Sequence, residues 1–298
     1  MPELHDLPLR TSAGSKKAGA SSSAAAGTSL SIEDMKVIAK RLRRHIISMI
    51  GKAGSGHPGG SLSAVEIVTT LFFKVLRHRP SDPGWSERDR FILSKGHAAP
   101  LLYAALAECG YLPVDELSTL RQLDSRLQGH ADRTCTPGVE MSAGALGQGL
   151  SFAIGIAMAG RLNSQDHQVY VLLGDGECDE GQVWEAAMAA AHFKVDTLVA
   201  IVDNNGIQLD GWNREIMNLE PFGKKWEAFG WHVIEVDGHD LPQLIDALGQ
   251  ARLVRGQPAV IIAHTIKGKG VSFMENNPDF HGKAPNAAEM KIALEELA

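Results

Sequence analysis

The sequence predicts a doubly wound α/β fold, in which a mainly parallel sheet carries helices on both faces. Three apolar runs, Val169–Leu173, Leu198–Val202 and Ala259–Ala263, are almost continuously hydrophobic, which is typical of parallel strands covered on both sides. Helical patterns at Gln182–His192 and Leu241–Leu253 lie between apolar runs and predict right-handed crossovers. Strands that alternate with helices in this way favour a single parallel sheet over a sandwich or a bundle.

The remaining elements follow from similar patterns. Ser31 is a suitable N-cap for a helix that runs to about Ile50. The Gly147–Leu162 segment is apolar on nearly all sides, which predicts a buried helix packed closely through its glycines. Two further helices and two further strands are expected at Leu62–Leu76, Ala98–Cys109, Phe91–Leu93 and His232–Val236.

The chain divides by composition at about residue 30. Residues 1–30 contain a Gly/Ala/Ser-rich tract that cannot bury enough apolar surface to order itself, and a disordered tail is expected there. The tract lacks the apolar core of a secretory signal, so an uncleaved extension is the favoured interpretation. Residues 31–298 show no internal repeat or linker, which predicts one domain.

Bulk properties exclude several classes of protein. The formal net charge is −6, which gives no electrostatic case for nucleic-acid binding. The apolar runs are far shorter than a membrane span. Cys109, Cys135 and Cys178 are an odd number of cysteines without CxxC spacing, which favours reduced thiols that pack as small buried hydrophobes. We therefore expect a cytoplasmic protein.

Hard oxygen donors follow two neighbouring strands of the predicted sheet. Gly174-Asp175-Gly176 follows the first strand, and Asn205 lies at the end of the second. Ligands bind beyond the carboxyl ends of such strands, and one carboxylate with one amide suits Mg²⁺, which takes its other ligands from phosphates and water. The two glycines leave room for a diphosphate. Either motif alone is more often a turn or a helix cap, but the pair predicts a metal–diphosphate site.

Four histidines lie in glycine-flanked loops. They are His57 (SGHPGG), His97 (SKGHAA), His130 (QGHAD) and His281 (FHGKAP). A single loop histidine is usually a solvated surface residue. The repeated pattern favours a function, because glycine allows a close approach to a ligand and histidine titrates near neutrality. The other eight histidines lack this context and are interpreted as structural.

These motifs together resemble those of a known enzyme family. The segment that opens with GDG and closes with NN resembles the thiamine-diphosphate motif, and its surroundings, from about Ile32 to Pro285, resemble transketolase. The segment 144–149 (GALGQG) has the order GxxGxG and no preceding strand, which excludes a dinucleotide fingerprint. It is instead similar to the GxLGQG segment of the family. The resemblance implies thiamine diphosphate with Mg²⁺ or another divalent cation.

The resemblance also implies roles for individual residues. His57, His130 and His281 would bind the sugar and take part in catalysis, and the metal ligands would be Asp175, Asn205 and Ile207. The cofactor would be bound by His97, Gly144, Leu146, Gly174, Asp175, Gly176, Glu180, Asn205 and His281. Lys267 and Lys269, in the segment HTIKGKG, could equally form a solvated turn.

The resemblance covers only the family's diphosphate-binding domain, and we expect the pyrimidine-binding and C-terminal domains to be absent from this chain. The resemblance therefore implies the N-terminal subunit of a two-polypeptide transketolase, which moves a two-carbon ketol unit between sugar phosphates only with a second, C-terminal subunit, as an α2β2 assembly. A transketolase for an unusual sugar phosphate and a 2-oxo acid dehydrogenase α-subunit remain as enzyme alternatives. A non-catalytic binding subunit is the alternative from another class.

Overall fold

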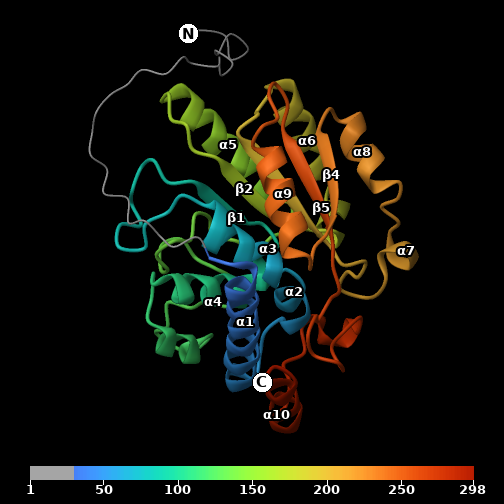
Figure 1. Ribbon diagram of the computed structural model, residues 1–298. Helices are drawn as coiled ribbons and strands as arrows, with labels where there is room; N and C mark the ends of the chain where they lie inside the picture. The colour runs from blue at the N-terminus through green and yellow to red at the C-terminus, as the bar shows by residue number, and fades with distance from the viewer. Residues whose placement is uncertain (1–29) are drawn as a thin grey trace.

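A five-stranded parallel sheet forms the centre of the molecule, as Figure 1 shows for the computed structural model, which describes residues 30–298. The strands lie in the order β1-β2-β3-β5-β4, and every neighbouring pair is parallel. Their bounds are Arg90–Leu93, Val169–Gly174, Leu198–Asn204, His232–Asp237 and Ala259–His264 for β1 to β5. All five predicted strands are confirmed, and so is the mainly parallel sheet.

Helices cover both faces of this sheet (Figure 1). One core contains residues of α1, α3, α4 and α9, and the other contains residues of α5, α6 and α8. Consecutive residues of β2, Tyr170 and Val171, belong to opposite cores because side chains alternate along a strand. The helix bounds from α1 to α10 are Ile32–Ala53, Pro58–Ser63, Val65–Thr70, Ala99–Cys109, Gln148–Leu162, Gly181–His192, Asn213–Ile216, Phe222–Ala228, Leu241–Ala251 and Ala287–Glu296.

The first helix begins as predicted. Ser31 is the N-cap of α1: its hydroxyl accepts a hydrogen bond from the Asp34 N–H, and the Asp34 carboxylate accepts one from the Ser31 N–H. The helix ends at Ala53, and its C-cap, Gly54, has a φ of 62°, in the left-handed region that glycine tolerates. The tail expected at residues 1–30 lies, except for its last residue, outside the described residues.

The predicted continuous helix Leu62–Leu76 is wrong. The segment divides into α2, α3 and a π-helical turn at Leu71–Val75. At the joint, Ala64 leaves helical geometry with ψ of 15°, and the neighbouring Ser63 hydroxyl donates a hydrogen bond to Asp203 at 2.5 Å. Apolar periodicity continues across the joint, so it could not indicate the break in the helix.

The helix predicted at Gly147–Leu162 is buried on one face only. In α5, Leu150 and Ala157 are buried, whereas Phe152 is 41% and Leu162 is 58% exposed. Close packing through glycine is confirmed at Gly149, where an added Cβ would lie 2.3 Å from the Ser94 Oγ. The exposed apolar side chains show that this helix presents a hydrophobic surface, which the sequence pattern had assigned to the interior.

The prediction that the cysteines are buried thiols is confirmed at Cys178, whereas Cys109 is half-buried and Cys135 is exposed. All three are free thiols, and Cys135 lies in the loop after His130. Within residues 30–298, no helix has the length and apolar character needed to cross a membrane.

Candidate active site

The carboxyl ends of β2 and β3 bring the predicted oxygen donors to one edge of the sheet. Gly174 is paired with Asp203 in register, so Asp175 and Asn205 leave adjacent strands side by side. A pocket of 300 Å³ opens at this edge. Nine predicted site residues line it: His97, Leu146, Gly174, Asp175, Gly176, Glu180, Asn205, Ile207 and His281.

Asp175 is buried in this pocket beside a second acid. Its carboxylate accepts hydrogen bonds from the backbone N–H groups of Gly176, at 2.9 Å, and Gly206, at 2.5 Å. Burial, reinforced by the nearby Asp203 carboxylate, raises the pKa of Asp175 to about 6. A cation bound to this carboxylate would lower its pKa again, because it stabilises the ionised form.

The donor set fits a divalent cation that borrows ligands from a phosphate. No cluster of three or more His, Cys, Asp or Glu side chains in the described part of the chain could hold a metal by itself. Asp175 offers a carboxylate, Asn205 an amide oxygen, which accepts from the Ile207 N–H at 3.2 Å, and Ile207 a carbonyl. These are hard oxygen donors in a number too small for a complete cage, which is the usual situation of Mg²⁺ beside phosphate groups.

The two glycines beside Asp175 differ in what they accommodate. A Cβ on Gly176 would lie 2.6 Å from the Gln208 Cβ, so the protein's own packing requires glycine there. A Cβ on Gly174 would meet nothing closer than 3.8 Å, and Gly174 lines the pocket. Only Gly174 therefore leaves space that a ligand could use.

Asp203 is a buried acid that the sequence analysis did not identify. It accepts hydrogen bonds from the ammonium group of Lys95, from the hydroxyls of Ser63 and Thr265, and from the Asn205 amide at 3.3 Å. Burial opposes its ionisation, but Lys95, together with the hydroxyls of Ser63 and Thr265, outweighs burial and lowers the pKa of Asp203. The available signal was an aspartate at the end of the apolar run LVAIVDNN, where β3 should still be buried.

Glu177 is the second buried acid that was missed. Its carboxylate accepts hydrogen bonds from the Gly147 N–H at 2.9 Å, the Gly174 N–H at 3.0 Å and the Ser94 hydroxyl. It therefore connects the turn after β2 to the GALGQG segment. The predicted Glu180 is exposed at the rim of the pocket, next to Gly147, where an added Cβ would lie 2.8 Å from the Glu180 Cβ.

The four predicted histidines meet in space although the sequence separates them by up to 224 positions (281 − 57). The ring of His57 is 5.6 Å from that of His97, 6.2 Å from that of His130 and 5.5 Å from that of His281, measured between centroids. The His57 Nδ1 is buried and has no hydrogen-bond partner among the described residues. Gly144 lies beside this cluster, since its added Cβ would be 3.9 Å from the His130 ring.

All four imidazoles are held in the neutral form. Burial, followed by the charge of Arg121, lowers the pKa of His57 to about 4. Burial and the nearby Lys267 lower the pKa of His281 to about 3. Burial also lowers the pKa of His97 and of His130. A neutral imidazole keeps one nitrogen without a proton, which can accept a hydrogen bond or a proton from a bound ligand.

Lys267 belongs to the site, so the solvated-turn alternative is wrong for this residue. Its side chain is buried, and its Nζ donates to the Ile207 carbonyl at 2.9 Å and lies 2.9 Å from the His281 Nδ1. Burial and the charge of Lys95 lower the pKa of Lys267 to about 8. Lys269, in contrast, is partly exposed and pairs with Glu275 at 3.3 Å.

The chain matches the family described as transketolase, thiamine diphosphate binding domain, over residues 34–298. It is 45% identical over 264 residues to a 6-deoxy-6-sulfo-D-fructose transketolase subunit from Clostridium sp., which covers 89% of this chain and 96% of that protein. It is also 45% identical over 269 residues to one of the subunits of an apulose-4-phosphate transketolase from Actinobacillus succinogenes, covering 90% and 97%.

Solved structures agree with these matches. The transketolase from Campylobacter jejuni superposes with a TM-score of 0.86 at 36% identity, over 90% of this chain and 43% of that one. The chain thus spans less than half the length of that structure. With its fold, its pocket and its histidine cluster, this chain belongs to the transketolase family of enzymes and corresponds to the family's thiamine-diphosphate-binding domain.

Proposed function

We propose that this chain is the cofactor-binding subunit of a two-polypeptide transketolase, which moves a two-carbon ketol unit from a ketose phosphate to an aldose phosphate. The meeting of four neutral histidines beside the Asp175 pocket carries the proposal, because it places proton-accepting groups next to a site for a metal and a diphosphate. The relatives from Clostridium sp. and Actinobacillus succinogenes are themselves named as transketolase subunits.

The residues of the pocket would hold the cofactor in a defined way. Asp175, Asn205 and the Ile207 carbonyl would bind the divalent cation, and Gly174 would leave room for the diphosphate beside it. When bound, thiamine diphosphate supplies the nucleophilic carbon and stores the electron pair that ketol transfer requires. The buried Lys267 and His281 would add donors near the same groups.

The histidines would perform the proton transfers. His57 and His130 would bind hydroxyls of the ketose and share proton transfers at its carbonyl oxygen, while His97 and His281 would contact the cofactor. The buried His57 Nδ1, which lacks a partner within the described chain, is a nitrogen that a substrate hydroxyl could satisfy. His97 is placed by Gly60, where an added Cβ would lie 2.8 Å from the His97 Nε2.

Substitution of the sugar-facing histidines tests these roles. His57→Ala and His130→Ala should lower turnover by ~10²–10⁴-fold, the usual contribution of one acid–base group, while cofactor affinity is retained. His192→Ala, at the end of α6 and outside the pocket, is the control and should behave as wild type. Wild-type kinetics in both active-site variants would contradict the assignment.

A second subunit would cover the exposed apolar surface near the pocket. The helices α5 and α6 pack together, and Phe152 and Leu162 on α5 and Met188 on α6 are 41%, 58% and 58% exposed. Both helices begin close to pocket residues, at Gln148 and Gly181, next to Leu146 and Glu180. Exposed apolar side chains on helices that begin beside the pocket suit an interface with a second subunit, and two copies of each chain in an α2β2 assembly is our proposal.

Reconstitution tests the need for this partner. The chain alone, saturated with thiamine diphosphate and Mg²⁺, should show no ketol transfer, and activity should appear when the second subunit is added. Light scattering of the active mixture should give the mass of two copies of each chain. Turnover by the isolated chain equal to that of the mixture would exclude the two-polypeptide proposal.

An unusual sugar phosphate or sulfonate is the second candidate for the substrate. Two of the relatives are named for apulose-4-phosphate and for 6-deoxy-6-sulfo-D-fructose, and they are as similar to this chain as human transketolase, which is 44% identical over 266 residues. A panel of ketose donors and aldose acceptors, assayed with the assembled enzyme, separates these candidates by kcat/KM.

The three free thiols support a cytoplasmic location as part of the same proposal.

A further inference from the structure

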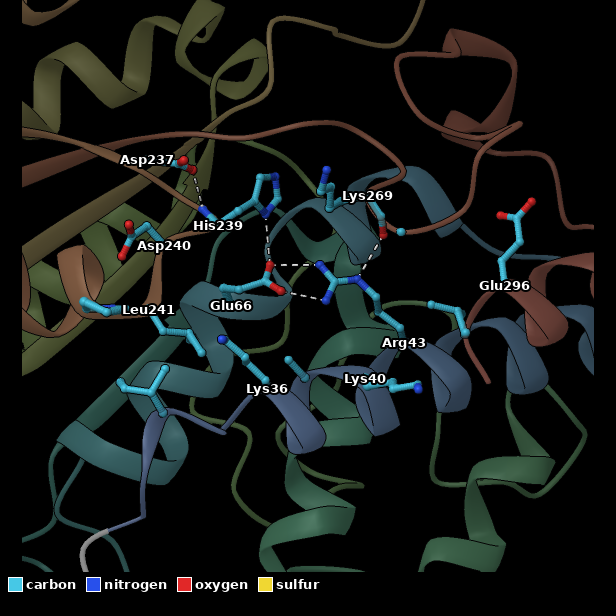
Figure 2. Close-up of a pocket in the computed structure, with 15 residues that line it drawn as sticks. Lys36, Lys40, Arg43, Glu66, Asp237, His239, Asp240, Leu241, Lys269 and Glu296 are labelled. Carbon is cyan, nitrogen blue, oxygen red and sulfur yellow. Dashed lines mark hydrogen bonds and ion pairs between the residues drawn. The ribbon is translucent and has the colours of Figure 1, made fainter. Parts of the chain in front are cut away.

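Three ionisable side chains from distant segments meet outside the active-site pocket (Figure 2). Arg43 of α1 donates from its Nη1 and Nη2 to the two carboxylate oxygens of Glu66 in α3, at 2.6 and 2.8 Å. The Nδ1 of His239, in the turn between β4 and α9, lies 2.9 Å from the same carboxylate. We call Arg43, Glu66 and His239 the Glu66 triad. It lies in a pocket of 710 Å³ that contains none of the predicted site residues.

Arg43 and His239 also form hydrogen bonds with one backbone segment, which contains Ile266 and Lys269. The Arg43 Nε donates to the Lys269 carbonyl at 2.9 Å, and the Ile266 N–H donates to the His239 Nε2 at 2.9 Å. The His239 ring therefore connects the Glu66 carboxylate to the Ile266 N–H. Burial opposes the ionisation of Glu66, but His239 and Arg43 outweigh it and hold its pKa at about 2.

The segment held in this way carries an active-site residue. Lys267 lies between the two anchored positions, and its Nζ reaches the Ile207 carbonyl and the His281 ring inside the pocket, both at 2.9 Å. The Gly268 N–H donates to the Gly59 carbonyl at 3.0 Å, which fixes the segment from its inner side. The lysine stem is flexible, so the position of its ammonium group depends on the backbone that bears it.

We propose that Arg43, Glu66 and His239 are positioning residues that fix segment 265–270 and so place the Lys267 ammonium group in the active site. The effect of the triad on turnover rests on the proposed function, whereas its effect on segment 265–270 does not. A misplacement of about 1 Å at a reacting centre can lower turnover by roughly 100-fold. Loss of the triad should therefore reduce turnover although no member of it lines the pocket.

The same helix provides a matched control. Arg41 and His45 of α1 pair with Glu108 of α4 at 2.9 and 2.8 Å. The Glu108 side chain is 12% exposed, against 11% for Glu66. This second Arg–Glu–His group makes no hydrogen bond to segment 265–270 within residues 30–298. Glu108→Gln therefore matches Glu66→Gln in chemistry and in the burial of the carboxylate, but not in its connection to Lys267.

The first measurement is hydrogen–deuterium exchange of the peptide that covers residues 265–271. Glu66→Gln and His239→Asn should raise its exchange rate at least about tenfold, whereas Glu108→Gln should not. His239→Gln should restore protection, because its side-chain oxygen can reach the position of the lost Nε2. His239→Asn leaves the Arg43–Glu66 ion pair in place, so the comparison holds even if Glu66→Gln does not fold. Unchanged exchange in His239→Asn would overturn the proposal, whatever reaction the enzyme catalyses.

The second measurement is a double-mutant cycle on the assembled enzyme. Glu66→Gln should lower kcat by roughly 10–100-fold in the wild-type background and by much less in the Lys267→Met background, because the triad acts through Lys267. Equal losses in both backgrounds would overturn the proposal. An inactive wild-type assembly would instead contradict the proposed function, and the exchange experiment would still test the triad.

Discussion

Two buried aspartates at the carboxyl edge of the sheet, Asp203 at the end of β3 and Asp175 just after β2, have opposite electrostatic surroundings. Asp203 accepts the ammonium group of Lys95 and two hydroxyls, and its pKa is lowered. Within residues 30–298, Asp175 accepts only two backbone N–H groups, and its pKa is raised to about 6. Both are nearly inaccessible to solvent, at 0% and 2% exposure, so burial does not explain the difference.

The two carboxylates differ in how completely other groups of the protein pair with them. Asp203 has a full set of internal partners, and it also orients Asn205 through the amide. Asp175 forms no ion pair among the described residues, and the nearby Lys95, which pairs with Asp203, only partly offsets its burial. A buried carboxylate is costly unless a cation binds it. We therefore assign a structural role to Asp203 and expect the metal at Asp175.

Removal of Lys95 should have the largest effect. Lys95→Met leaves the Asp203 carboxylate buried without a cation, which should destabilise the chain by about 3–5 kcal/mol. Urea denaturation of the purified variant measures this loss. The double variant Lys95→Met/Asp203→Asn removes both charges and should recover part of the stability. If it is no more stable than Lys95→Met, the pair does not stabilise the edge in the way we describe.

The residues at the carboxyl edge of the sheet could be predicted from the sequence, because short local patterns mark them. Apolar runs located β2 and β3, and Asp175 and Asn205 directly follow or end them, so the topology of a parallel sheet brought them together. The four histidines were found from their glycine-flanked loops. Their common location could not be derived from spacing, because it depends on where four separate loops return to the same strand ends.

The partners of the buried charges could not be predicted. Lys95 and Asp203 are separated by 108 residues, and only the register between β1, β2 and β3 brings them together. Lys267 was ambiguous for the same reason, since a lysine between glycines is typical of a solvated turn. The exposed face of α5 was missed because an apolar pattern identifies surface removed from water, without indicating whether the same chain or another covers it.

The pH dependence of stability should differ between wild type and Asp175→Asn in metal-free protein. The folded pKa of Asp175 is raised from 3.8 to about 6, so the folded state retains a proton that the unfolded state loses. Stability should therefore fall as pH rises from about 4 to 6 and then level off, by about 3 kcal/mol from this group. Asp175→Asn should lack this fall. Urea denaturation in a chelator across pH 4–8 measures it, and parallel curves would contradict the assigned environment.

Metal-dependent cofactor binding should require Asp175, in keeping with its role as the metal-binding acid. Asp175→Asn should weaken thiamine diphosphate binding in Mg²⁺ by at least about 100-fold, equivalent to about 2.8 kcal/mol, because the diphosphate charge is then less neutralised. Calorimetry on the assembled enzyme measures the affinity, with circular dichroism to confirm the fold. Asp179→Asn alters an exposed acid at the rim of the same pocket and should retain wild-type affinity. Equal affinity in Asp175→Asn would show that the metal binds elsewhere.

The smallest effect is expected for the hydroxyl that bonds to Asp203 from α2. Ser63→Ala removes a hydrogen bond of 2.5 Å to a carboxylate that keeps Lys95, Thr265 and Asn205 as partners. Hydrogen bonds to charged groups contribute about 1.5–3 kcal/mol, and the remaining donors should hold the loss near the lower limit. Cofactor affinity should be unchanged, because Asp175 retains all of its contacts. If Ser63→Ala instead weakens metal-dependent binding as strongly as Asp175→Asn, Asp203 is part of the metal site and the distinction between the two aspartates fails.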